Sequence, residues 1–251
     1  MNVLVDNKIP FIEGMLEAIP NVTKAEYIAP EEFTRERVAE ADALFVRTRT
    51  RCDASLLEGS KVRFIGTATI GYDHIDRQWC AEHGVTTRNA PGCNAPGVAQ
   101  WAFAAIAACL PYCLPEETTL GIVGVGHIGK IVESWARSIG FKVLLNDPPR
   151  AEAEGPQGFV SLDEIAAQAD IITFHTPLTR QPDEHASYHL CNAEFLSKLA
   201  KRPLLLNAAR GPVVDTDALI AAHAAGLTRA LAIDCWEGEP EIRKDLMDIA
   251  A

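Results

Sequence analysis

Thr118-Thr-Leu-Gly-Ile-Val-Gly-Val-Gly-His-Ile-Gly-Lys130 is the stretch that decides the fold, because its glycines fall where an apolar run gives way to a helical pattern. This is the GxGxxG spacing of a dinucleotide-binding turn. Gly124 would make the tight turn, Gly126 would let the backbone approach a pyrophosphate, and Gly129 would let the helix pack closely on the strand. The helix, expected to begin near Ile128, would direct its free N–H groups and positive dipole end at the phosphates.

The next apolar run supports this interpretation, since a lone GxGxxG is a weak signal. Phe141 to Leu145 is typical of a strand and ends in Asn146-Asp147, at the offset where a carboxylate should meet the adenosine ribose. Asp147 could accept hydrogen bonds from both ribose hydroxyls and would repel a 2′-phosphate, so NAD is favoured over NADP. Asp147 could instead be a solvated strand-end aspartate. The guanidinium of Arg150 could weaken the preference for NAD over NADP.

Composition excludes several classes of protein. The formal net charge of −11 and the lack of a Lys/Arg cluster argue against nucleic acid or an anionic membrane surface as partner. We see no signal-peptide pattern and no apolar stretch long enough to span a bilayer, so a cytoplasmic location is expected. The seven cysteines form no CxxC and no paired His spacing, so neither a metal nor a disulfide framework is indicated.

The alternation of short apolar runs with helical segments predicts an α/β fold with two doubly wound parallel sheets. Residues 1–93 are expected to form a flavodoxin-like substrate domain, and residues 94–251 a Rossmann NAD domain. The turn-rich Asn89–Asn94 and the Ala-rich helix Val98–Cys109 mark the crossing between them. Strands of the first domain are expected at Asn2–Val5, Ala43–Val46 and Arg63–Ala68.

The second domain continues after Asp147 with further alternation. Pro148–Gly158, rich in Pro, Glu and Gly, predicts an exposed loop, and Ser161-Leu-Asp-Glu164 resembles a capping box that begins a helix ending near Ala169. The remaining elements are expected as strands at Ile171–Phe174, Pro203–Leu206 and Ala230–Ile233 and as helices at Ala193–Leu199 and Thr216–Ala225.

Two loops that follow predicted strands carry candidate ligand contacts. In His175-Thr-Pro177, Thr176 is a plausible cofactor contact, while His175 has equal claims to chemistry and to a structural role fixed by loop backbone. In Asn207-Ala-Ala-Arg-Gly211, Arg210 is the best substrate anchor, because its planar fork suits bidentate binding of a carboxylate. A surface arginine that caps the loop is the alternative.

Asp234-Cys-Trp-Glu-Gly-Glu-Pro240 places three acids within six residues after another predicted strand. Such a cluster usually needs a cation or a histidine nearby. Asp234 could approach the nicotinamide end of the cofactor, and Glu239 could raise the pKa of a histidine and hold its tautomer. A solvated acidic loop explains the cluster equally well.

The first domain offers candidate anion contacts after two of its strands. Thr67-Ala-Thr-Ile-Gly-Tyr-Asp73 has small residues whose N–H groups could form an anion nest facing the same cleft. Thr48, with Arg47 and Arg49 beside it, could meet a second anionic group of the substrate. An exposed basic loop is the alternative.

Together these motifs resemble the D-2-hydroxyacid dehydrogenase family over essentially the whole chain. The residues that carry the resemblance are Val3-Leu-Val-Asp6, Gly66-Thr-Ala-Thr69, Asp73-His-Ile-Asp76, Ala90-Pro-Gly-Cys-Asn-Ala95, Gly121-Ile-Val-Gly-Val-Gly126, Asn146-Asp-Pro-Pro-Arg150, Phe174-His-Thr-Pro177 and Trp236-Glu-Gly-Glu-Pro-Glu241. The Gly-Cys-Asn-Ala and Asp-Pro-Pro-Arg elements indicate a branch that acts on a phosphorylated 2-hydroxy acid.

The resemblance implies a role for each matching position. Arg210 would orient the substrate, Glu239 would pair with a catalytic histidine, and Thr48 and Thr69 would bind substrate. The implied NAD contacts are Gly124, Gly126, His127, Ile128, Gly129, Asp147, Thr176, Ala208 and Asp234. The implied activity is NAD-dependent oxidation at C2 by a homodimer. A dehydrogenase of another 2-hydroxy acid, such as phosphoglycerate, and a non-catalytic NAD(H)-binding module are the alternatives.

One departure from the family pattern concerns the acid/base histidine. In the family it follows the Glu-Pro turn by a short helix and strand, in a Pro-His context, and none of the seven histidines here follows a proline in that way. We therefore expect residues 1–251 to lack this histidine, together with the family's last sheet strand and closing helix. A placed acid/base histidine contributes roughly 10²- to 10⁴-fold in rate, so binding would survive while turnover collapses.

Overall fold

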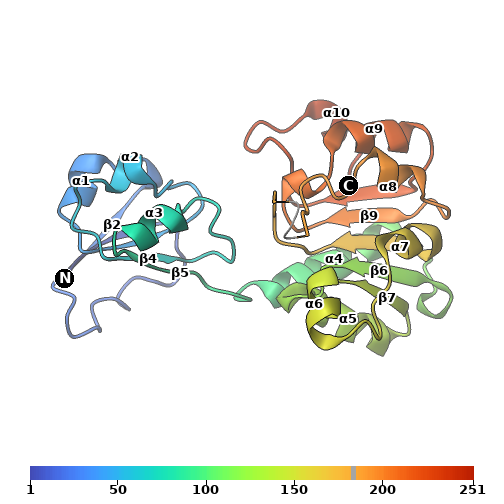
Figure 1. Cartoon of the computed structure of the whole chain (residues 1–251), viewed down its shortest axis with the longest axis horizontal. Helices are drawn as coiled ribbons and strands as arrows, with labels where there is room; N and C mark the ends of the chain where they lie inside the picture. The colour runs from blue at the N-terminus through green and yellow to red at the C-terminus, as the bar shows by residue number, and fades with distance from the viewer. Residues whose placement is uncertain (182–184) are drawn as a thin grey trace. The chain divides into compact units, whose positions relative to one another are not determined.

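The computed structural model describes residues 1–181 and 185–251, which divide into two compact units, Met1–Cys93 and Asn94–Ala251 (Figure 1). Each unit is built on one five-stranded sheet, and every strand pair in both sheets is parallel. The predicted α/β class with two parallel sheets is confirmed. None of the helices in the described residues is long and apolar enough to cross a bilayer.

The sheet of the first unit has the strand order β2-β1-β3-β4-β5, which is the flavodoxin-like order. Its strands are β1 (Asn2–Asp6), β2 (Lys24–Ile28), β3 (Ala43–Val46), β4 (Phe64–Thr67) and β5 (Thr86–Arg88). The sequence interpretation missed the two edge strands. β2 begins with a lysine and carries a glutamate, and β5 has only three residues, so neither shows the apolar run of a central strand.

Different segments cover the two faces of this sheet. The helices α1 (Arg35–Ala39), α2 (Ala54–Leu57) and α3 (Arg77–Glu82) contribute Val38, Leu57 and Cys80 to one core cluster. On the other face, residues 7–22 form turns that contribute Ile9 and Leu16. Turns therefore fill the place where a crossover helix between β1 and β2 would lie.

The sheet of the second unit has the strand order β10-β9-β8-β6-β7. Its strands are β6 (Thr119–Val123), β7 (Lys142–Asn146), β8 (Ile171–Phe174), β9 (Leu204–Asn207) and β10 (Ala230–Ile233). An isolated parallel bridge from Leu145 to Phe159 lies beside β7. With this bridge in the place of a third strand, the order is 3-2-1-4-5-6, that of a dinucleotide-binding domain.

Both faces of this sheet are buried, which explains its nearly continuous apolar strands. In β9, Leu204 and Leu206 belong to the cluster formed with α4 (Ala95–Cys109) and α5 (His127–Ile139). Leu205 belongs to the opposite cluster. The helices that contribute to this opposite cluster are α7 (Leu162–Gln168), α8 (Ala193–Ser197), α9 (Thr216–Ala224) and α10 (Lys244–Met247).

The prediction of an exposed loop over Pro148–Gly158 is wrong for Pro148–Glu154, although Gly155–Gly158 does lie outside any helix. Pro148–Glu154 forms the helix α6, with Asp147 as N-cap and the two prolines in the first turn. Proline suits these positions because its fixed φ is helical and its missing N–H would be unpaired there. The capping box at Ser161 is confirmed, because Ser161 and Glu164 exchange side-chain-to-backbone hydrogen bonds at the start of α7.

Candidate functional site

The glycine turn connects β6 to α5 at the carboxyl end of the sheet. Gly124 has φ +90°, and a Cβ on it would lie 2.7 Å from the carbonyl carbon of His175. A Cβ on Gly129 would lie 2.2 Å from the Gly124 carbonyl oxygen. A Cβ on Gly126, by contrast, would meet nothing within 4 Å. Side chains are thus excluded by the fold itself at the first and third glycines, whereas the space beside Gly126 is open.

Gly126 is also the N-cap of α5, and no side chain caps this helix end. His127 and Ile128 are the first two residues of the helix. Backbone N–H groups in a first helical turn lack intrahelical partners, and the helix dipole adds positive potential there. The turn is therefore suited to bind a pyrophosphate.

Asp147 follows β7 and connects the glycine turn to α6. One carboxylate oxygen accepts the Val125 N–H at 2.7 Å, and the other accepts the Arg150 N–H at 3.1 Å. A carboxylate has about four lone-pair positions, so these two bonds fix its orientation and leave acceptor capacity for ribose hydroxyls.

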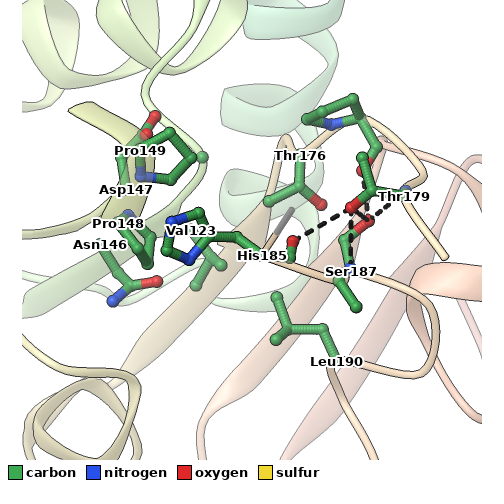
Figure 2. Close-up of a pocket in the computed structure, with 13 residues that line it drawn as sticks. Val123, Asn146, Asp147, Pro148, Pro149, Thr176, Thr179, His185, Ser187 and Leu190 are labelled. Carbon is green, nitrogen blue, oxygen red and sulfur yellow. Dashed lines mark hydrogen bonds between the residues drawn. The ribbon is translucent and has the colours of Figure 1, made fainter. Parts of the chain in front are cut away.

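Asp147 borders a pocket of about 240 Å³ at the carboxyl ends of β6, β7 and β8. Figure 2 shows Asp147 with Pro148 and Pro149 on one side of it and Thr179 with Ser187 on the other. The lining residues are Val123, Gly124, Asn146, Asp147, Pro148, Pro149, Thr176, Pro177, Thr179, His185, Ala186, Ser187 and Leu190. Among the described residues, the buried Thr176 hydroxyl has no hydrogen-bond partner. An apolar pocket with a few polar groups, next to an open phosphate turn, fits an adenosine dinucleotide.

His175 precedes Thr176 and is buried. Its Nε2 lies 2.9 Å from the Thr173 hydroxyl, and its backbone N–H donates to the Val123 carbonyl at 2.7 Å. Burial lowers the pKa of His175 to about 4, so the ring is neutral at neutral pH. These contacts favour the structural interpretation of His175 over the chemical one.

Arg210, Asp234 and Glu239 lie in the loops that follow β9 and β10, close enough to Cys235 for their charges to affect the pKa of its thiol. Burial raises the pKa of Cys235 to about 12; the charges of Asp234 and Glu239 raise it as well, and that of Arg210 lowers it. Burial also raises the pKa of Asp234, and the nearby charge of Glu239 adds to this rise. One arginine and two acids therefore follow these strands in the unit that carries the glycine turn.

Backbone contacts hold these side chains in place. The Asn207 amide donates to the carbonyls of Arg210 and Cys235, at 3.0 and 3.2 Å. Arg210 Nη1 donates to the Ala209 carbonyl at 2.7 Å, and Glu239 accepts the Trp236 N–H at 2.7 Å. Ala208, a predicted cofactor contact, is buried in the same loop.

Sequence reasoning missed the histidine of this region. His189 Nε2 lies 2.7 Å from Glu237, and its Nδ1 lies 3.6 Å from Asp215. Glu237 also accepts the Thr216 N–H at 3.2 Å. The acidic cluster did signal a need for a histidine, but the one found in the described residues pairs with Glu237 rather than Glu239.

In the first unit, Thr48 and Thr69 follow the neighbouring strands β3 and β4. Thr48 is exposed, whereas the Thr69 hydroxyl lies 2.7 Å from that of Thr67 and donates to the Gly71 carbonyl. Arg47 Nη1 donates to a backbone carbonyl at Lys8, 3.0 Å away. The two threonines therefore lie at the same end of this sheet, next to a basic side chain.

Comparison with known proteins gives a consistent result. The family model for the NAD binding domain of D-isomer specific 2-hydroxyacid dehydrogenases matches residues 106–250. The erythronate-4-phosphate dehydrogenase of Bacteroides thetaiotaomicron is 45% identical over 250 residues, which cover 99% of this chain and 71% of the relative. The enzyme of the same name from Porphyromonas gingivalis is 44% identical, with coverage of 100% and 68%.

Solved structures agree with these relatives. D-lactate dehydrogenase from Aquifex aeolicus, complexed with NAD and lactic acid, superimposes with a TM-score of 0.81 and 26% identity, covering 98% of this chain and 83% of that one. The NAD⁺-bound 3-phosphoglycerate dehydrogenase of Entamoeba histolytica gives 0.79 and 26%, covering 96% and 82%. The chain belongs to the D-isomer specific 2-hydroxyacid dehydrogenases, and its second unit is an NAD-binding domain of that family.

Proposed function

We propose that this chain catalyses the NAD-dependent oxidation of 4-phospho-D-erythronate to 2-oxo-3-hydroxy-4-phosphobutanoate, a step of pyridoxal phosphate biosynthesis. The observation that carries the proposal is that the second unit holds Asp147 on the glycine turn and carries Arg210, Asp234 and Glu239 in the loops that follow β9 and β10. Sequence identity of 44–46% to erythronate-4-phosphate dehydrogenases across nearly the whole chain supports this choice of substrate.

In this proposal Arg210 binds the substrate carboxylate through its planar fork and so fixes the orientation of C2. NAD, when bound, supplies the acceptor for the hydride that leaves C2. Asp234, whose pKa is raised by burial, contacts the nicotinamide end of the cofactor. In the first unit, Thr48 and Thr69 are the proposed substrate-binding residues.

The C2 hydroxyl proton needs an acceptor, and family resemblance implies a histidine paired with Glu239. In the described residues Glu239 accepts a hydrogen bond from the Trp236 N–H, while His189 pairs with Glu237. We therefore propose that the described residues bind cofactor and substrate, and that full turnover requires a histidine paired with Glu239.

Two measurements test this function. Titration of the chain with NADH reports cofactor binding, and NADH absorbance reports turnover of 4-phospho-D-erythronate, with 3-phosphoglycerate as the competing substrate. We expect NADH to bind, and turnover to be selective for 4-phospho-D-erythronate. Preference for 3-phosphoglycerate would move the assignment to that substrate. NADH binding without turnover of either substrate would indicate a non-catalytic binding module.

We also propose that the assembled enzyme is a homodimer, as the family resemblance implies. Sedimentation equilibrium of the chain tests this directly, and a mass equal to one chain at micromolar concentration would overturn it.

A further inference from the structure

Arg150 lies where a dinucleotide domain can choose between NAD and NADP. An aspartate or glutamate after the second strand binds the ribose hydroxyls of NAD, whereas an arginine nearby can accommodate the 2′-phosphate of NADP. This chain has both, since Asp147 follows β7 and Arg150 is three residues further on. The residue pair alone therefore leaves the selectivity open.

The structure assigns the Arg150 guanidinium to other partners. Its Nε and Nη2 donate to the two carboxylate oxygens of Glu154, at 2.8 and 2.6 Å. Its Nη1 donates to the Val125 carbonyl at 3.0 Å, and its carbon atom Cζ lies 5.3 Å from the centre of the Phe159 ring. The side chain is only 26% exposed. The two-pronged face that would bind a phosphate is thus occupied by a carboxylate.

The helix α6 creates this arrangement. Arg150 and Glu154 are four residues apart, so a helix places them on the same face, whereas an extended loop would separate them. Asp147 caps this helix, and Pro148 and Pro149 occupy its first turn. The helix that holds the arginine therefore begins at the ribose-binding carboxylate.

We propose that Glu154 is a cofactor-specificity residue, which excludes NADP by keeping Arg150 paired. A 2′-phosphate would have to displace the Glu154 carboxylate from Arg150 and would also lie near the Asp147 carboxylate. NAD, which has only hydroxyls there, needs neither change. This inference rests on NAD binding by the second unit and is independent of the substrate.

The test compares the affinities of NADH and NADPH, measured by calorimetric or fluorescence titration of the chain and its Glu154→Gln variant. Glutamine keeps the size of the side chain and removes its charge. We expect NADPH to bind about tenfold more tightly in Glu154→Gln, in line with a regained charge-assisted bond from Arg150. The affinity for NADH should change by less than about twofold, because Asp147 and the glycine turn are unaltered.

Two further variants isolate the cause. Glu194→Gln removes the same charge from a matched i,i+4 pair with Lys198 on α8, and should leave the ratio of NADPH to NADH affinity unchanged. Adding Arg150→Met to Glu154→Gln should abolish the gain for NADPH. The gain should also shrink as salt is raised.

An unchanged affinity ratio in Glu154→Gln, or an equal gain in Glu194→Gln, would overturn the proposal. Failure of the unmodified chain to bind NADH would instead contradict cofactor binding itself, so the two failures are distinguishable.

Discussion

A methyl group on Gly129 would lie 2.2 Å from the carbonyl oxygen of Gly124, whereas one on Gly126 would meet no atom within 4 Å. Three glycines in one motif thus meet different requirements. The first lets the backbone of His175 and Thr176 pass close to the turn, the third lets the helix approach the strand, and the second keeps an accessible surface free of side chains. Substitutions at Gly129 and Gly126 can therefore distinguish an effect on folding from an effect on cofactor binding.

Gly129→Ala should destabilise the second unit, because the Gly124 carbonyl is backbone and cannot move aside without distorting the turn. We expect a loss of about 3 kcal/mol in the free energy of unfolding, measured by denaturant titration. Gly97→Ala is the control, since Gly97 lies in α4 with nothing near its Cβ position. That variant should be neutral or more stable by up to about 1 kcal/mol. Equal effects at both positions would contradict the close packing at Gly129.

Gly126→Ala should leave folding nearly intact and weaken NADH binding. Alanine is a poorer N-cap than glycine, so we expect a loss of at most about 1 kcal/mol in stability. The added methyl group would occupy the space through which a pyrophosphate approaches the backbone, and NADH affinity should fall at least about tenfold. Unfolding curves and NADH titrations of the same preparation measure both quantities. Unchanged affinity would show that the cofactor does not use this side of the turn.

His175 should make stability fall as the pH falls from about 6.5 to 4. Its pKa is lowered by burial to about 4 in the folded protein, whereas an unfolded chain takes up a proton near 6.5. The unfolded state therefore binds more protons in this window. The contribution of His175 to the free energy of unfolding is fully present above about pH 6.5. It falls by up to roughly 3 kcal/mol toward pH 4.

The comparison for this pH dependence is His175→Gln, which cannot titrate, with His83→Gln at an exposed histidine as the control. We expect His175→Gln to reduce the slope of unfolding free energy against pH between 6.5 and 4, and His83→Gln to keep it. The same slope in all three proteins would exclude His175 as its source.

His189→Leu should destabilise the turn that carries Glu239. Burial would by itself raise the pKa of Glu237, but hydrogen bonds from His189 and Thr216 outweigh this and lower it. Removing His189 leaves a half-buried carboxylate with one partner fewer, at a cost of about 1–3 kcal/mol. In the His189→Leu background, Glu237→Gln should recover part of that loss. A double-mutant cycle by chemical denaturation measures the coupling, and additive effects would contradict it.

The sequence predicted the central strands and the glycine turn because each leaves a local signal. Ile171–Phe174 is apolar except for Thr173, and the structure places it at the middle of a sheet covered on both faces. The helix α6 has a local signal too, in an N-cap aspartate followed by two prolines and an i,i+4 Arg–Glu pair. The two prolines, and the glycines at 155 and 158 that follow the helix, made the whole segment resemble a loop.

The side-chain pairs of the site could not be predicted in the same way. His189 and Glu237 are 48 residues apart, and Arg150 reaches a carbonyl 25 residues earlier in the chain. Such contacts depend on which loops the parallel strands bring to one edge, and on rotamers that periodicity does not specify. The spacing of apolar residues indicates the fold class, but these long-range side-chain contacts become apparent only in the three-dimensional structure.

Val125 connects the two halves of the cofactor site through both of its backbone polar groups. Its N–H binds Asp147 and its carbonyl binds Arg150, so one peptide segment links the phosphate turn to the ribose side. Groups that are already ordered lose little conformational entropy when a ligand arrives. We therefore expect the adenosine half of NAD to meet a preorganised surface and to supply a large share of the cofactor's binding free energy.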